Sequence, residues 1–195
     1  MQKLTRADIF SLEKYAEIRS KYRAEVMAHK KNRQVQVGPN ATLYFEDRIT
    51  MQYQIQEMLR VERIFEASGI NEELEAYNPL IPDGSNWKAT FMIEFLDVEE
   101  RRVALQRLRG IENSVWVQVA GFDRVHAIAD EDLEREDDTK TSSVHFLRFE
   151  LTPDMVKAVK KGAAIAAGID HPHYHHEIAA IPQVVRDSLA DDLAT

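Results

Sequence analysis

The chain has 195 residues, 44% of them hydrophobic, which fits one large domain or two small ones with a buried core and argues against disorder over most of its length. It contains no cysteine, which excludes disulfides, thiolate zinc sites, cysteine-ligated iron–sulfur clusters and a cysteine nucleophile. Its formal net charge of −8 at pH 7 argues against general binding to nucleic acid.

The first 80 residues carry mainly helical patterns. Apolar and aromatic residues at steps of three and four predict an amphipathic helix over about 11–32. Alternating polar and apolar residues on both sides of a Gly-Pro-Asn turn predict a hairpin over 34–46. A second long helix is predicted over about 48–67, ended by Gly69, and a shorter helix over about 71–77.

The second long helix carries charged residues beside an apolar stripe. Glu62 lies at the helical step between Met58 and Phe65, so we expect it at the apolar boundary and more buried than its charged neighbours. Because a buried charge without a partner is costly, we expect four side chains to make ion pairs or hydrogen bonds with other elements: Glu57, Arg60, Glu62 and Arg63. Burial also shifts pKa values, which makes Glu57, Glu62 and His145 the candidates for general acid–base chemistry.

Prolines, glycine and serine at residues 79–86 predict a junction between two parts of the chain. Residues 1–80 then form a helix-rich part, and residues 86–195 form a β-rich part; the alternative is one compact domain. Periodicity in the second part predicts strands over 90–95, 115–119, 125–128, 144–151 and 163–169, and helices over 98–109, 153–162 and from Pro182 onward. We therefore expect an α+β fold, in which a helical N-terminal part with a small hairpin precedes an antiparallel or mixed β-sheet with flanking helices.

Charge is distributed unevenly along the chain. Residues 1–37 carry nine Lys/Arg and four Asp/Glu, so this segment is either a solvated helix face or a docking surface for an anion or an acidic partner. Residues 130–138 hold seven acids and one arginine. We expect a solvated, mobile loop there, because the spacing lacks the glycine that an EF-hand needs at its sixth position.

The N-terminal residues and the hydropathy pattern indicate where in the cell the protein is located. The first eight residues include charges where a signal peptide needs an apolar run, and no stretch approaches the roughly 20 apolar residues of a membrane span. We expect a cytoplasmic protein that binds neither membranes nor nucleic acid.

The segment 170–177 holds four of the seven histidines of the chain: His171, His173, His175 and His176. In an extended segment the first three share one face, whereas in a helix the neighbours are His171/His175 and His173/His176, although Pro172 disfavours a regular helix. Two imidazoles, with oxygen from Asp170 or Glu177, suit a divalent metal such as zinc, nickel or iron.

Two interpretations of this cluster remain open. In the first, it forms a functional metal site, for which a separate element, carrying His145 or His126, would supply a further ligand. In the second, it is a polar loop in which one histidine is structural. The sequence lacks a GxSxG elbow, an HExxH helix, a kinase signature, a P-loop and the βαβ glycine fingerprint.

Several segments resemble a bacterial family that is defined as a domain of unknown function, number 3501. The resemblance spans nearly the whole chain and is carried by these residues: Leu4-Thr5, Asp8-Ile9, the run from Gln54 to Arg63, Leu147-Arg148-Phe149, Gly168-Ile169-Asp170-His171-Pro172 and Tyr174. Of the four clustered histidines only His171 lies in a segment that resembles the family. We therefore expect an ordered role for His171, with Asp170 and Tyr174 beside it, and greater exposure for the other three.

The resemblance brings no known activity, but it implies a genomic association with rubrerythrin-like and iron–sulfur oxidoreductase proteins. On that basis we expect a non-catalytic binding or accessory module of a redox or peroxide-defence system, with an oxidoreductase as its partner protein. One alternative is a metal-dependent enzyme centred on His171. Another is a structural oligomer with no small-molecule site.

Overall fold

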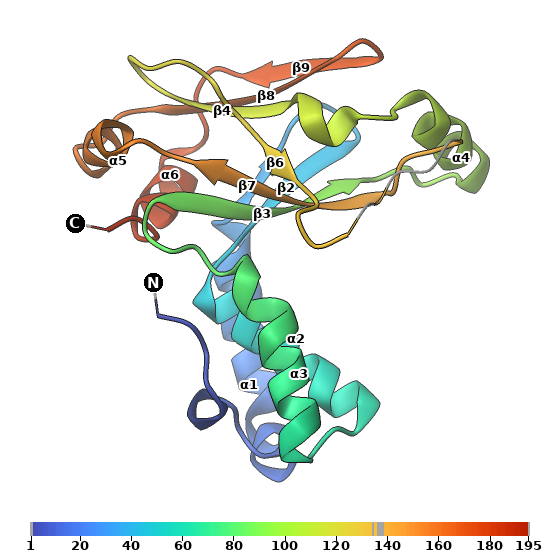
Figure 1. Ribbon diagram of the computed structural model, residues 1–195, viewed down its shortest axis with the longest axis vertical. Helices are drawn as coiled ribbons and strands as arrows, with labels where there is room; N and C mark the ends of the chain where they lie inside the picture. Colours follow the sequence, from blue (N-terminus) through green and yellow to red (C-terminus); the bar gives the residue numbers. More distant parts are fainter. Residues whose placement is uncertain (1, 134, 136–138, 195) are drawn as a thin grey trace.

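The computed structural model describes residues 2–133, 135 and 139–194, and has an α+β fold (Figure 1). Three helices, α1 (Leu12–Lys31), α2 (Arg48–Glu62) and α3 (Ala67–Tyr77), form a bundle that projects from one side of two antiparallel sheets. The predicted fold class is confirmed. None of the described helices is long and apolar enough to cross a membrane.

Side-chain caps set where the bundle helices begin. The Ser11 hydroxyl accepts a hydrogen bond from the backbone N–H of Lys14 at the start of α1, and Asp47 forms a capping box with Thr50 at the start of α2. Apolar side chains of α2 and α3 form the small core of the bundle together with the N-terminal segment and the residues that precede the next strand: Leu4, Met51, Ile55, Leu59, Leu74 and Ile81.

Nine strands form the two sheets over the described residues. The five-stranded sheet has the order β1 (Gln34–Gln36), β2 (Ala41–Glu46), β3 (Asn86–Ile93), β7 (Val144–Glu150) and β6 (Ile128–Ala129). The four-stranded sheet has the order β5 (Val125–His126), β4 (Val115–Val119), β8 (Ile165–His171) and β9 (Tyr174–Ile178). Because side chains alternate along each strand, one face of each sheet is apolar, and these two faces share the main core of the protein.

Four further helices lie at the margins of the sheets (Figure 1): α4 (Val98–Arg107), α5 (Pro153–Lys160), α6 (Gln183–Ala190) and the short 3₁₀ helix η3 (Ile111–Ser114). Two other 3₁₀ helices belong to the bundle, where η1 (Arg6–Asp8) contacts α3 and η2 (Asn78–Leu80) directly follows it. Helix α6 is bound to the five-stranded sheet, since the Trp87 indole Nε1 donates a hydrogen bond to the Leu189 carbonyl at 2.9 Å.

Most predicted elements are present, but two expectations were wrong. The second helix does not run to residue 67: it ends at Glu62 because Arg63 adopts a left-handed conformation (φ 56°), and Gly69 lies inside α3 rather than ending a helix. The strand predicted over 125–128 is not continuous but is divided between the two sheets. Strand β5 pairs with β4, but Ile128 belongs to β6, which pairs with β7 in the other sheet.

The predicted hairpin over 34–46 is confirmed as β1 and β2. Strand β2 also pairs with β3 over its full length, so strands from both sides of the predicted junction at 79–86 share one sheet. The division of the chain at that junction stays a prediction.

Candidate functional site

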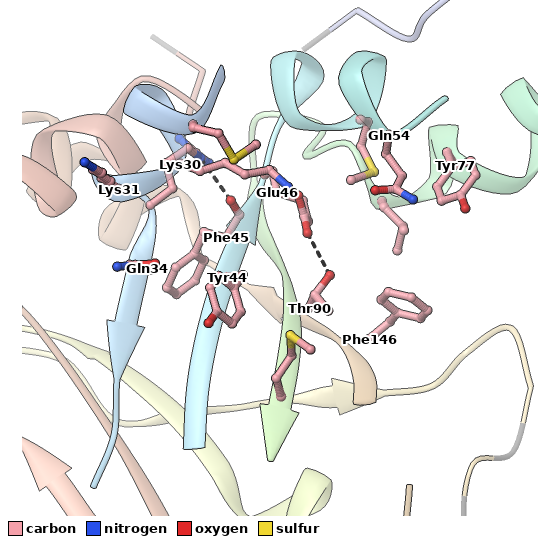
Figure 2. Close-up of a pocket in the computed structure, with 15 residues that line it drawn as sticks. Lys30, Lys31, Gln34, Tyr44, Phe45, Glu46, Gln54, Tyr77, Thr90 and Phe146 are labelled. Carbon is pink, nitrogen blue, oxygen red and sulfur yellow. Dashed lines mark hydrogen bonds between the residues drawn. The ribbon is translucent and has the colours of Figure 1, made fainter. Parts of the chain in front are cut away.

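A groove lies between the helical bundle and the outer face of the five-stranded sheet (Figure 2). Its cavity volume is about 600 Å³, within the range of small-molecule sites. The strand register determines which side chains form the floor of the groove: Tyr44 pairs with Thr90, and Thr90 pairs with Phe146, so one row of side chains crosses three strands. Because successive side chains of a strand point to opposite faces of the sheet, this row lies on the face opposite the main core.

The helices supply the opposite wall of the groove. Met27, Lys30 and Lys31 come from the last turns of α1, and Met51 and Gln54 come from α2. Tyr77 and Leu80 close the wall from the end of α3 and from η2, and Met92 adds a third methionine from β3. The lining is mainly apolar, and methionine side chains adapt to ligands of varied shape.

A few polar groups converge within this apolar lining. The Thr90 hydroxyl donates a hydrogen bond to Glu46 Oε1 at 2.7 Å, and Glu46 is only 6% exposed (Figure 2). Burial raises the pKa of Tyr44, and the nearby charge of Glu94 adds to this effect. Lys30 and Lys31 lie at the α1 end of the groove, where Lys30 Nζ is 5.8 Å from the centre of the Tyr53 ring.

A buried ion network lies beneath the α1 end of the groove. Arg33 Nη2 donates to Asp192 Oδ2 at 2.5 Å and to the Glu46 carbonyl at 3.2 Å, while Arg33 Nε lies 3.4 Å from Asp47 Oδ2. Burial raises the pKa of Asp192 to about 7, against the opposing effect of the Arg33 charge. The network fixes the C-terminal segment and the end of α1 to β2, and therefore holds one wall of the groove.

The groove continues into a second hollow of about 460 Å³ that shares Tyr77, Leu80 and Phe146 with the first. Lys88 and Arg148 line this extension. The Lys88 ammonium donates to the Pro79 carbonyl at 2.7 Å, and burial lowers the pKa of Lys88. Arg148 donates two hydrogen bonds of 2.8 Å to the carboxylate of Glu131.

The histidine segment lies elsewhere, on the β8–β9 hairpin, and neither predicted backbone geometry is correct. Pro172 and His173 form the two-residue turn, so the chain reverses between His171 and Tyr174. His171 is buried: its Nε2 lies 2.9 Å from the Arg109 carbonyl, and its Nδ1 accepts the His173 backbone N–H at 3.2 Å. Both ring nitrogens are thus engaged by backbone groups.

The other residues of this segment differ in exposure, as expected. His173, His175 and His176 are exposed, as is Glu177. Tyr174 is buried, and its hydroxyl donates to the Val37 carbonyl at 2.7 Å and accepts the Asn40 backbone N–H at 2.9 Å. Among the residues that the structure describes, no three His, Cys, Asp or Glu side chains are grouped so that they could hold a metal ion.

Charged partners surround the outer side of this hairpin. Arg124 Nη1 donates to Asp170 Oδ2 at 2.6 Å, and Arg124 Nη2 donates to Glu177 Oε2 at 3.3 Å. His175 Nδ1 lies 3.2 Å from Asp170 Oδ1. The Arg124 guanidinium also lies 3.8 Å from the centre of the Trp116 ring.

His145 is fully buried and belongs to a separate polar network. Its Nδ1 lies 2.6 Å from Asp130 Oδ2, and its Nε2 lies 3.0 Å from both the Thr141 hydroxyl and the Ser142 carbonyl. Hydroxyl, imidazole and carboxylate occur in the order of a nucleophilic triad, but Thr141 is also buried, so its hydroxyl faces no open site. His145 and His171 are not brought together in one site, because they lie on different sheets.

This network corrects the prediction of a solvated acidic loop at its first residue. Asp130 is 90% buried as a side chain and accepts hydrogen bonds from the Phe146 backbone N–H at 2.9 Å and from Arg135 at 3.1 Å. Residues 134 and 136–138 of the predicted loop lie outside the described residues.

The charged residues predicted on α2 have different environments. Glu57 pairs with Arg19 and Tyr15 of α1, as expected for a partly buried carboxylate. Glu62 is exposed, so the expectation that it is the most buried of the group was wrong. Arg60 and Arg63 are also exposed, because α2 ends at this point and its last turn extends into solvent.

Sequence reasoning missed the residues that form the groove. Tyr44, Thr90 and Phe146 alternate with core residues in their strands, and this alternation indicates that they share a sheet face once the register is known. The sequence carries no signal that the helical bundle covers this face.

Comparisons with known proteins agree on the relationship of this chain. The family described as "Protein of unknown function (DUF3501)" matches residues 3–193. The crystal structure of a novel protein of unknown function from Burkholderia pseudomallei K96243 is 51% identical, with a TM-score of 0.94 over 99% of this chain and 100% of the other. No curated protein matches the chain.

Proposed function

Because the chain belongs to this family of proteins of unknown function, we propose from its own geometry that it is a non-catalytic binding module and that the groove is its ligand site. The observation that supports the proposal is the cavity of about 600 Å³ between α1, α2 and the outer face of β2, β3 and β7. A mainly apolar cavity with a few convergent polar groups is typical of a site for a small molecule.

The lining points to an amphipathic anion as the ligand. Phe146, Met51 and Met92 favour an apolar or aromatic body, and the Thr90–Glu46 pair offers acceptors to one donor group of the ligand. Lys30 and Lys31 lie at one end of the groove, where a carboxylate, sulfonate or phosphate of the ligand would be placed.

The groove is tested with 8-anilinonaphthalene-1-sulfonate, an aromatic anion whose fluorescence rises on binding. We expect saturable binding to the wild type and its loss in Thr90→Trp, because the indole fills the groove. The matched control is Gln118→Trp on the outer face of the other sheet, which should bind like the wild type. Equal binding by both variants contradicts the proposal.

A second comparison separates the two ends of the ligand. Lys30→Glu/Lys31→Glu should weaken binding of the sulfonate probe by about tenfold and leave the neutral probe N-phenyl-1-naphthylamine unaffected. An equal loss for both probes would mean that the lysines do not recognise the anionic group.

We further propose that the module serves a redox or peroxide-defence system and that its partner protein is an oxidoreductase. The support for this part is the family resemblance. Because the chain has no cysteine, thiol or iron–sulfur chemistry in such a system would belong to the partner. The basic segment 1–37, which includes Lys30 and Lys31 at the groove, is the surface we propose for the partner.

A further inference from the structure

Strand β9 is an edge of the four-stranded sheet, and its outward backbone groups are open. The order β5-β4-β8-β9 places β9 last, so only one of its sides is paired. Over the described residues, no hydrogen bond of the backbone N–H or C=O groups of His175 and Glu177 to another part of the chain is found. Such an edge is a template for pairing with another strand.

The hydrogen bonds of β8 establish which residues of β9 face outward. On the β4 side, the Ala120 N–H donates to the Ala164 carbonyl, and on the other side the Ile181 N–H donates to the Ile165 carbonyl. Odd-numbered residues of β8 therefore direct their backbone groups toward β9. The register pairs Ile169 with His176, so His176 bonds inward and its two neighbours, His175 and Glu177, direct their N–H and C=O groups outward.

The outward pair has a self-complementary pattern of side chains. In an antiparallel pair of two β9 strands centred on His176, His175 of each copy lies opposite Glu177 of the other. These are the positions whose backbone groups are open, so the same register satisfies four backbone hydrogen bonds and joins two imidazole–carboxylate pairs. A shift by one residue would place an outward-facing residue opposite one whose backbone groups face inward, and a shift by two residues would place like residues opposite each other, His175 against His175 or Glu177 against Glu177.

The flanking charges extend this complementarity. Asp170 lies 3.2 Å from His175, and Arg124 lies 3.3 Å from Glu177 on the same outer face. Across the seam the order becomes Asp170, His175, then Glu177 and Arg124 of the second copy, which alternates in sign. The side chains of His175 and Glu177 are 71% and 55% exposed, so neither has to be uncovered first.

We propose that two copies of this chain associate through their β9 strands, in antiparallel register centred on His176, to form one continuous eight-stranded sheet from the two four-stranded sheets. The occupant of the edge is a second copy because the sequence of β9 complements itself when it is reversed about His176. The arrangement is isologous, and closes with two-fold symmetry.

The absence of cysteine permits a direct test of this register. In the proposed dimer the two His176 Cα atoms form a non-hydrogen-bonded pair about 4.5 Å apart, within the range of a disulfide. Under mild oxidation His176→Cys should give a covalent dimer. The control His173→Cys places the sole thiol in the exposed turn, away from the two-fold axis, and should remain monomeric on a non-reducing gel.

The wild-type association is measured by light scattering and sedimentation over a range of protein concentrations. Glu177→Pro removes an outward N–H that bonds to nothing in the monomer, so it should abolish the dimer and leave the fold intact. The matched control is Gln36→Pro on β1, at the edge of the other sheet, which should remain dimeric. Glu177→Lys should raise the dissociation constant of the dimer about tenfold, because the two-fold symmetry means that both His175–Glu177 pairs are lost at once.

The outcomes separate the proposal from its competitors. A monomeric wild type at all concentrations, together with no cross-link in His176→Cys, overturns it. A dimer that persists in both Glu177 variants also overturns the proposal, because the interface would then lie elsewhere. Equal cross-linking of His173→Cys and His176→Cys overturns it too, because it would indicate random collision.

Discussion

The ion pair between α1 and α2 gives the sharpest prediction of stability. Glu57 Oε1 accepts hydrogen bonds from the Tyr15 hydroxyl and from Arg19 Nε, both at 2.7 Å, and Glu57 Oε2 accepts one from Arg19 Nη2, also at 2.7 Å. Glu57→Gln keeps the size of the side chain and removes its charge. The bidentate pair and its bond from the buried Tyr15 hydroxyl are then lost or weakened.

The pKa of Glu57 provides the magnitude. The hydrogen bond from Arg19 is the largest cause that lowers this pKa from 4.5 to about 2, with Tyr15 adding to it and burial opposing it. That difference corresponds to roughly 3 kcal/mol of stabilisation of the charged form. The Arg19 side chain is 31% exposed, so solvent screens part of the interaction. We expect Glu57→Gln to lower the free energy of unfolding at pH 7 by about 2 kcal/mol, and Tm by about 4–8 °C.

The same pair predicts the response to acid. Because the pKa of Glu57 is lower in the folded state than in the unfolded state, its stabilisation is fully present above about pH 4.5 and is lost as the pH falls from 4.5 toward 2. Urea unfolding of the wild type across this window should show a steeper loss of stability than that of Glu57→Gln.

Glu62→Gln is the matched control, since Glu62 lies on the same helix and is exposed. It should change the free energy of unfolding by less than about 0.5 kcal/mol. The reasoning is refuted if Glu57→Gln is as stable as the wild type at pH 7, if its acid response is unchanged, or if both variants cost the same.

Three further predictions concern the buried ion network, the turn between β1 and β2, and the proposed partner. Arg33→Met should lower the free energy of unfolding in urea by about 3–5 kcal/mol, because it leaves the buried Asp192 carboxyl without its cation; a loss below 1 kcal/mol would contradict this. Gly38→Ala should lower Tm and cost about 1–3 kcal/mol, since Gly38 has φ +73° and an added Cβ would lie 2.6 Å from His176 and Tyr174, whereas the same change at Gly121, which has open space, should cost only the backbone strain. In pull-downs from native extract, an oxidoreductase should be recovered at low salt and lost at high salt or with Lys30→Glu/Lys31→Glu; equal recovery in all cases would contradict the proposed surface.

Local patterns predicted most of the elements, because their causes are local. The period of α1 and the alternation around Gly38 each require only neighbouring residues, and both elements are present at nearly the predicted bounds. The end of α2 was missed because Arg63 adopts a left-handed conformation, which sequence favours at glycine or asparagine and not at arginine. The wrong expectation for Glu62 follows from this error, since a helix that continued to residue 67 would have placed Phe65 on its apolar stripe, whereas Phe65 is 74% exposed.

The groove and the buried networks depend on contacts between distant residues. Thr90 and Phe146 become neighbours only through the pairing of β3 with β7. Asp130 was assigned to a solvated loop because six other acids surround it in the sequence, but its partner His145 lies fifteen residues away and is fully buried. The composition of the segment indicates that its residues are exposed on average, but it does not identify Asp130 as the one that is buried.

The histidine segment shows how strand geometry divides a dense motif. His171 and Tyr174 are the pair that closes the two-residue turn, so their side chains point into the protein and both are engaged by backbone groups. The residues that follow alternate, which leaves the backbone groups of His175 and Glu177 on the open edge. The clustered histidines that favoured a metal site in the sequence therefore have two different environments: His171 is buried and structural, whereas His175 and His176 lie on an exposed strand. This strand has a self-complementary order of charges, which makes association between two copies the more specific expectation for this surface.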